Sequence, residues 1–189
     1  MSQSLSKAVL LTGAAARISQ EVALFDQLRG IKESSLKGLP LTVSQDDTLL
    51  TGFSSGSLNL AAINACFSNG CTLNWDSYYK QQVLFPLRNQ DVYKIKMFPW
   101  DTTPLCETIT KFLNTMNCEK PEDLAFYSFI LTFSWSELET IWVCSQNEED
   151  FYLNLTDVFM ASTAIPVLFP SQKIGFVDRQ TSSFPGGQF

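Results

Sequence analysis

The sequence of 189 residues contains no histidine. Without an imidazole, neither a Ser-His-Asp triad nor a Cys-His pair can form within the chain, so a nucleophilic side chain would need another base. The commonest zinc ligand is also missing, and the five cysteines include no close pair at metal-ligand spacing. These absences argue against a metal centre. The odd number of cysteines favours reduced thiols and a cytoplasmic location.

Basic residues are scarce, since 13 Lys and Arg face 19 Asp and Glu, for a net charge of −6. This balance argues against a nucleic-acid partner and against permanent adsorption to anionic lipid, but it leaves transient, peripheral contact with a membrane. No apolar run approaches the length of a membrane span. The apolar stretch 8–16 imitates a short signal peptide, but it is brief and fits a first strand better.

Apolar runs alternate with turn residues in a pattern typical of an α/β protein. We expect strands at 7–12, 48–51, 124–133, 140–144 and 174–177, and helices at 18–28, 54–68, 75–85, 101–116 and 157–162. The first strand should be a buried parallel strand, and the third and fourth should form a hairpin. The layout predicts one domain over 1–189, a three-layer α/β/α fold around a mainly parallel sheet.

The segment Gly52-Phe53-Ser54-Ser55-Gly56 fits the pattern G-x-S-x-G between a predicted strand and a predicted helix. A nucleophilic serine needs a sharp turn of this kind so that its hydroxyl projects above the sheet, and flanking glycines avoid clashes with strand and helix. The helix then directs its first N–H groups, beginning at Ser55, toward a developing oxyanion. A turn that is simply rich in serine and glycine is the structural alternative. The pattern makes Ser54 the candidate nucleophile.

Asp178 is the candidate base. A carboxylate can replace histidine if burial raises its pKa toward the working pH. Asp178 follows the apolar strand predicted over 174–177, and the carboxyl ends of strands are where α/β sheets place their sites. An ordinary aspartate in a turn is the alternative interpretation.

Several segments resemble the patatin-like phospholipase family of lipid acyl hydrolases. The stretch 52–59 is similar to that family's serine turn, which continues past the second glycine with a small residue, an aliphatic residue and Asn. The other similar segments are Asp101-Thr102-Thr103-Pro104-Leu105 at a helix start, Ala161-Ser162-Thr163-Ala164-Ile165-Pro166 with Phe169-Pro170, and Phe176-Val177-Asp178 at the family's D-G-G/A motif. Their order and spacing match over about 7–178.

The resemblance implies a Ser–Asp dyad of Ser54 and Asp178 that works through an acyl-enzyme. It implies an acyl lipid as substrate (a phospholipid, lysophospholipid, galactolipid or glyceride), transient contact with a lipid surface, and no metal or organic cofactor. The implied oxyanion hole contains Gly13, Ala14, Ala15, Arg17 and Ser55.

Two stretches depart from the family pattern. The family's oxyanion loop reads G-G-G-x-R/K-G, whereas this chain has Gly13-Ala14-Ala15-Ala16-Arg17-Ile18. Alanine resists positive φ at roughly 1 kcal/mol per residue, and one misaimed donor typically costs on the order of 10²-fold in rate. After Asp178 the chain reads Arg179-Gln180-Thr181 in place of Gly-Gly. From this we expect a truncated product, an alternative exon or a shifted reading frame, with a protein partner covering the C-terminal edge.

Other interpretations stay open from the sequence. A catalytically impaired patatin-fold protein, acting as a lipid-binding or assembly subunit, would explain the missing glycines. The stretch 12–15 also resembles the nucleotide loop of short-chain dehydrogenases, but Arg17 and Ser19 stand where that loop needs glycine, and no Tyr is followed four residues later by Lys. The aromatic residues of 75–100 could form a lid that faces lipid or could simply pack in the core.

Overall fold

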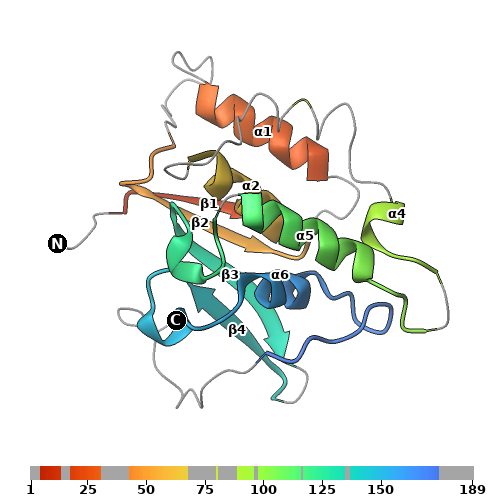
Figure 1. Ribbon diagram of the computed structural model, residues 1–189. Helices are drawn as coiled ribbons and strands as arrows, with labels where there is room; N and C mark the ends of the chain where they lie inside the picture. Colours follow the sequence, from red (N-terminus) through yellow and green to blue (C-terminus); the bar gives the residue numbers. More distant parts are fainter. Residues whose placement is uncertain are drawn as a thin grey trace.

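The computed structural model describes residues 5–13, 18–30, 43–67, 80, 89–95, 98–115, 117–134 and 137–174. The elements are β1 (Lys7–Leu11), α1 (Ile18–Gly30), β2 (Thr48–Phe53), α2 (Ser55–Phe67), α4 (Asn89–Val92), α5 (Thr103–Thr115), η2 (Pro121–Asp123), β3 (Tyr127–Ser134), β4 (Glu139–Cys144), η3 (Glu148–Asp150) and α6 (Leu155–Thr163) (Figure 1). Strands and helices alternate through the first half of the chain, which confirms the α/β class.

The four described strands form one open sheet in the order β1-β2-β3-β4. The first three strands run parallel, with Leu11 opposite Gly52 and Phe53 opposite Leu131. β4 returns antiparallel to β3, as the predicted hairpin requires. The sheet is therefore mostly parallel, and the carboxyl ends of β1, β2 and β3 share one edge. We call this edge the carboxyl edge and the opposite one the amino edge.

Helix α2 is the centre of the core. Its apolar side chains face several neighbours, since it packs against β1, β2 and β3 and against helices α1, α5 and α6. Nine of its thirteen residues are buried, as expected of a helix that is apolar around most of its circumference. α6 packs against β3 and α2, so α2 and α6 cover the same face of the sheet (Figure 1).

Buried polar side chains are paired at the amino edge. Asn64 of α2 is fully buried, and its Nδ2 donates to the Leu60 carbonyl at 3.0 Å and to Ser128 Oγ at 3.2 Å. Its Oδ1 accepts from the Phe126 amide at 2.8 Å. A buried amide with these partners fixes how α2 sits against the start of β3.

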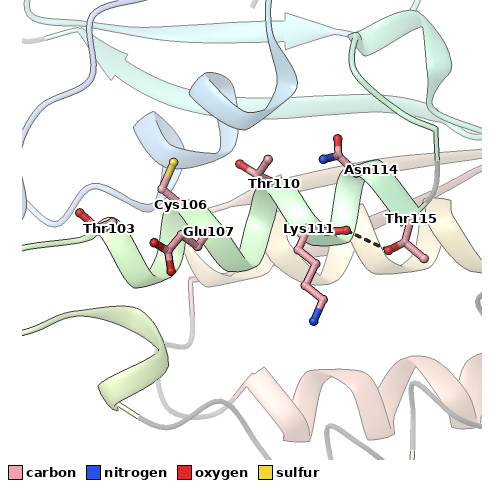
Figure 2. Close-up of a pocket in the computed structure, with 7 residues that line it drawn as sticks. All are labelled: Thr103, Cys106, Glu107, Thr110, Lys111, Asn114 and Thr115. Atoms are coloured by element: carbon pink, nitrogen blue, oxygen red, sulfur yellow. Dashed lines mark hydrogen bonds between the residues drawn. The ribbon is translucent and has the colours of Figure 1, made fainter.

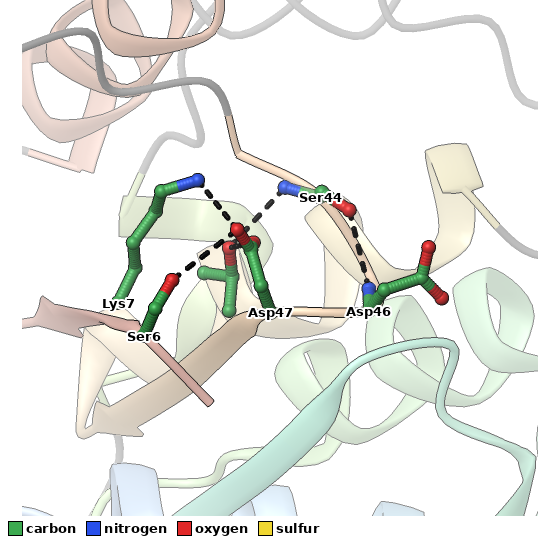
Figure 3. A network of polar contacts seen from close by, with 6 residues as sticks. Ser6, Lys7, Ser44, Asp46 and Asp47 are labelled. Carbon is green, nitrogen blue, oxygen red and sulfur yellow. Dashed lines mark hydrogen bonds and ion pairs between the residues drawn. The ribbon is translucent and has the colours of Figure 1, made fainter. Parts of the chain in front are cut away.

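A charged network holds the start of β1 at the same edge (Figure 3). Asp47, just before β2, accepts from Lys7 Nζ at 2.6 Å and from Ser6 Oγ at 3.3 Å. The hydrogen bonds from Lys7, Thr48 and Ser6, with that from Lys7 the most important, lower the pKa of Asp47 below its usual value. Backbone bonds from the Ser6 and Lys7 amides to the Asp47 carbonyl repeat the connection. Together they set the parallel register of β1 and β2.

Where the structure describes them, the predicted helices and strands agree with it in type, but β1 is less buried than expected and α4 was not predicted. The run 7–11 forms a parallel strand, but it is not fully buried: among the described strands it lies at the end of the sheet, and Leu10 is 61% exposed. An apolar composition suits both a central and a partly covered strand, so composition alone could not place it. The helix predicted at 75–85 lies outside the described residues, apart from Lys80. The strand predicted at 174–177 does as well, apart from Ile174.

Candidate active site

Ser54 occupies the turn that joins β2 to α2. Its φ is 53°, in the left-handed region that costs a residue other than glycine roughly 1 to 2 kcal/mol. β2 ends at Phe53 and α2 begins at Ser55, so Ser54 alone makes the connection. A strained serine on a one-residue strand-to-helix turn is the geometry that a nucleophilic serine requires.

The two glycines of the motif are required by close approach of the backbone. A methyl group on Gly56 would overlap the carbonyl oxygen of Leu11 and lie 2.5 Å from its carbonyl carbon. A methyl group on Gly52 would lie 3.0 Å from the Gly56 carbonyl oxygen. Side chains at these two positions would therefore separate α2 from β1 or open the turn. The expected role of both glycines is confirmed by this packing.

Gly13, the first residue of the predicted oxyanion loop, lies against the turn. A methyl group on Gly13 would lie 2.9 Å from Ser54 Cβ and 3.0 Å from Cε2 of Phe53. The register explains this proximity, because Leu11 pairs with Gly52 and the chains beyond them continue side by side. The structure therefore brings together Gly13, Ser54 and Ser55. Ala14, Ala15, Arg17 and Asp178 lie outside the described residues, so their roles stay predictions.

Ser162 is a contact of the turn that the sequence did not predict. Its Oγ, near the end of α6, accepts a hydrogen bond from the Ser54 amide at 3.0 Å. The Ser54 carbonyl accepts from the Ser57 amide at 3.0 Å and from Ser57 Oγ at 2.6 Å. Both backbone groups of the strained residue are thus held, and this offsets part of the cost of its conformation. Ser162 lies in the segment 161–166, which resembles the patatin-like family, but the sequence of that segment does not indicate that Ser162 contacts Ser54.

Glu21 and Asn59 secure both ends of the loop between β1 and α1. Glu21 Oε1 accepts from the Thr12 amide at 2.6 Å, and Oε2 accepts from Asn59 Nδ2 at 2.6 Å. Asn59 Nδ2 also donates to the Ile18 carbonyl at 3.2 Å. Thr12 and Ile18 flank the predicted oxyanion loop. Burial raises the pKa of Glu21, while the hydrogen bonds from Asn59 and Thr12 act in the opposite direction. The sequence alone indicates no role for either side chain.

Two surface grooves lie away from Ser54. One follows α5 and is lined by Thr103, Cys106, Glu107, Thr110, Lys111, Asn114 and Thr115 (Figure 2). The other runs between β1 and α1 and includes Thr12 and Glu21. The α5 groove has no strained residue and no side chain of the predicted site, so its size alone gives it no role. The second groove therefore reaches Thr12 and Glu21, whose hydrogen bond holds one end of the loop that begins at Gly13.

Comparison with known proteins does not assign the chain to a family. No protein-family model matches the chain, and no match is found among curated proteins. The described residues contain no group of three or more side chains that could hold a metal ion. Among the described helices, none combines the length and the apolar character needed to cross a membrane. The functional assignment therefore depends on the residues and their geometry.

Proposed function

We propose that this chain is a serine acyl hydrolase of the patatin-like type, with a three-layer α/β/α fold, that acts on acyl lipids. The observation that carries the proposal is the conformation of Ser54: a left-handed serine between a parallel strand and a helix, flanked by two glycines that packing requires. Further support comes from Gly13, because a methyl group there would lie 2.9 Å from Ser54 Cβ, so the predicted oxyanion loop begins beside the proposed nucleophile.

In the proposed reaction, Ser54 Oγ attacks the ester carbonyl carbon while Asp178 accepts the hydroxyl proton. The tetrahedral oxyanion is stabilised by amides of the loop that begins at Gly13 and by the Ser55 amide at the start of α2. Collapse of this intermediate breaks the bond to the alcohol, which leaves with the proton from Asp178. Water then attacks the acyl-enzyme with Asp178 as base, and this step releases the fatty acid and restores Ser54.

Covalent labelling with a fluorophosphonate tests the nucleophile directly. We expect the native chain to be labelled and the Ser54→Ala variant to lose labelling. Ser55→Ala is the matched control because it changes the neighbouring serine by the same atom and keeps the backbone amide. Labelling that persists in Ser54→Ala, or that is lost equally in Ser55→Ala, contradicts the proposal. A panel of acyl esters, turned over by the native chain and not by Ser54→Ala, then defines the substrate class.

One sequence feature favours a second function. Ala14, Ala15 and Ala16 stand where the family has glycine or a variable residue, so the oxyanion amides can be misaimed even though Ser54 keeps its turn. The chain would then bind lipid or serve as an assembly subunit without turnover. This second candidate predicts that the native chain shows fluorophosphonate labelling no faster than that of Ser54→Ala and ester turnover equal to that of Ser54→Ala. Turnover clearly above Ser54→Ala removes it.

A further inference from the structure

Two segments far apart in the sequence form a common surface beyond α6. The Trp100 amide donates to the Leu168 carbonyl at 2.8 Å. The Trp100 ring stacks on Tyr93 at a centroid distance of 4.6 Å and also contacts Phe169 at 6.4 Å. Phe98 extends this stack, with its ring 5.9 Å from that of Trp100. The aromatic residues therefore join 93–95 and 98–101 to 165–170 in one unit.

Large apolar side chains project from this unit into water. Ile95 is 72% exposed, Phe98 66%, Ile165 41% and Val167 84%. We call these four residues the apolar platform. Exposed apolar residues that occur singly are ordinary, but four on two joined segments indicate an interaction surface.

Val167 is held in a strained conformation. Its φ is 70°, which is an outlier for a β-branched residue and costs on the order of 1 to 3 kcal/mol. A residue such as Asn would avoid this cost. A side chain that is so exposed contributes little packing within the folded chain, so stability does not explain why this residue is valine. Strain combined with exposure indicates that the side chain serves a contact outside the folded chain.

The segment that carries Ile165 and Val167 follows α6, which contacts the turn at Ser54. Ser162, which accepts from the Ser54 amide at 3.0 Å, lies three residues before Ile165. The platform therefore lies on the carboxyl edge, next to the turn that carries the proposed nucleophile. A partner bound to the platform would be brought close to Ser54.

The charges around the platform differ from those of the whole chain. The described residues of the stretches 93–101 and 165–174 include two lysines and one acidic residue, so their charge is 2 − 1 = +1 within a chain of −6. The acidic residue, Asp101, accepts from the Thr103 amide at 3.0 Å and from Thr103 Oγ1 at 2.6 Å at the start of α5. Lys94 and Lys173 are exposed. Lysines beside exposed aliphatic and aromatic residues are typical of protein surfaces at a lipid–water interface.

We propose that the apolar platform docks onto a phospholipid membrane, with its apolar side chains among the acyl chains near the headgroups and its lysines at the phosphates. This inference rests on the proposed function for the choice of lipid as partner. A second copy of the chain fits less well, because a two-fold contact through the platform would bring like-charged lysines together. Four side chains also provide less area than the roughly 800 Å² per partner of a stable dimer.

Flotation of the full chain with vesicles of phosphatidylcholine containing a minor fraction of phosphatidylserine tests the docking. We expect the native chain and Ser54→Ala to bind equally. Val167→Asn should bind about tenfold more weakly, because it loses the burial of one aliphatic side chain, about 1.4 kcal/mol. Because Asn accepts positive φ, the melting temperature of Val167→Asn should not fall, and so loss of folding cannot explain weaker binding. Val167→Asn combined with Phe98→Asn should show no measurable binding.

Leu138→Asn is the matched control. Leu138 is 72% exposed and has a φ of 56°, but it lies between Glu137 and Glu139 in the β3–β4 turn. We expect its vesicle binding to equal that of the native chain. The docking proposal is overturned if the native chain does not bind vesicles, if Val167→Asn binds as tightly as the native chain, or if Leu138→Asn weakens binding to the same degree. Loss of a dimer in Val167→Asn, with vesicle binding unchanged, would instead assign the platform to a second copy. Platform-dependent binding without Ser54-dependent labelling would leave the docking standing and remove the proposed hydrolase.

Discussion

The two edges of the sheet differ in how they use strain and hydrogen bonding. Of the four described non-glycine residues with positive φ, three lie at the carboxyl edge: Ser54, Leu138 and Val167. Leu138 and Val167 are also mostly exposed. The amino edge contains the opposite arrangement, in which the buried Asn64 has a partner for each polar atom of its amide and Asp47 has several donors. One edge is thus strained and apolar, and the other is relaxed and polar.

This difference indicates that the residues that serve function gather at the carboxyl edge, while those at the amino edge serve stability alone. A folded chain keeps strained backbone only where the surrounding structure enforces it, and such residues gather at functional sites. The satisfied polar groups at the amino edge contribute to stability without presenting a reactive or apolar surface. Substitutions at the amino edge should therefore change stability and leave the reactivity of folded molecules unchanged. Substitutions of the strained residues Ser54 and Val167 at the carboxyl edge should change reactivity or binding without a loss of stability.

The largest effect should come from Gly56→Ala. The new methyl group would overlap the Leu11 carbonyl oxygen, and neither backbone segment can yield without moving α2 away from β1. We expect a loss of about 3 kcal/mol of folding free energy, measured by urea denaturation. Ala61→Gly, in the same helix, is the control for a change of one methyl group and should cost about 1 kcal/mol. Native stability in Gly56→Ala would mean that α2 and β1 are not in close contact at this turn.

Asn64→Ala should have the next largest effect and should act on stability alone. It would leave the buried Phe126 amide and Ser128 hydroxyl without their Asn64 partner, at a cost of about 2 kcal/mol. Fluorophosphonate labelling, corrected for the folded fraction, should match that of the native chain because Asn64 lies at the amino edge. Slower labelling of the folded fraction would show that the two edges are coupled. Exposed Thr115, changed to Ala at the end of α5, serves as the surface control and should change stability by less than about 0.5 kcal/mol.

The fold was predictable where the signal is local. The pattern G-x-S-x-G predicts the turn at Ser54 because the steric demands of that turn act within five residues. The alternation of apolar runs and turn residues predicts α1, α2, α5 and α6. The position of β1 in the sheet was not predictable. Strand order depends on pairing between distant segments, and the run 7–11 is apolar enough for either a central or an outer place.

The candidate site was predictable only in part for the same reason. Ser54 and its glycines are encoded locally, whereas Ser162 is 108 residues from Ser54 and Asn59 is 38 residues from Glu21. A serine or a glutamate on a helix is ordinary in a sequence, and its role appears only when packing brings it to the loop. The exposure of the apolar platform was hidden as well, because its residues are of the types that usually form a core.

The smallest predicted effect is a gain of stability at Ser54 itself. Glycine accepts a φ of 53° without the penalty that serine pays, but it loses more entropy on folding. The balance should stabilise Ser54→Gly by about 0.5 kcal/mol while it abolishes fluorophosphonate labelling. Ser55→Gly is the control, because a glycine inside the first turn of α2 should destabilise by about the same amount and keep the label. A less stable Ser54→Gly would mean that the serine side chain itself contributes to the stability of the fold. The backbone strain at Ser54 would then no longer indicate that this serine is kept for function at a cost in stability.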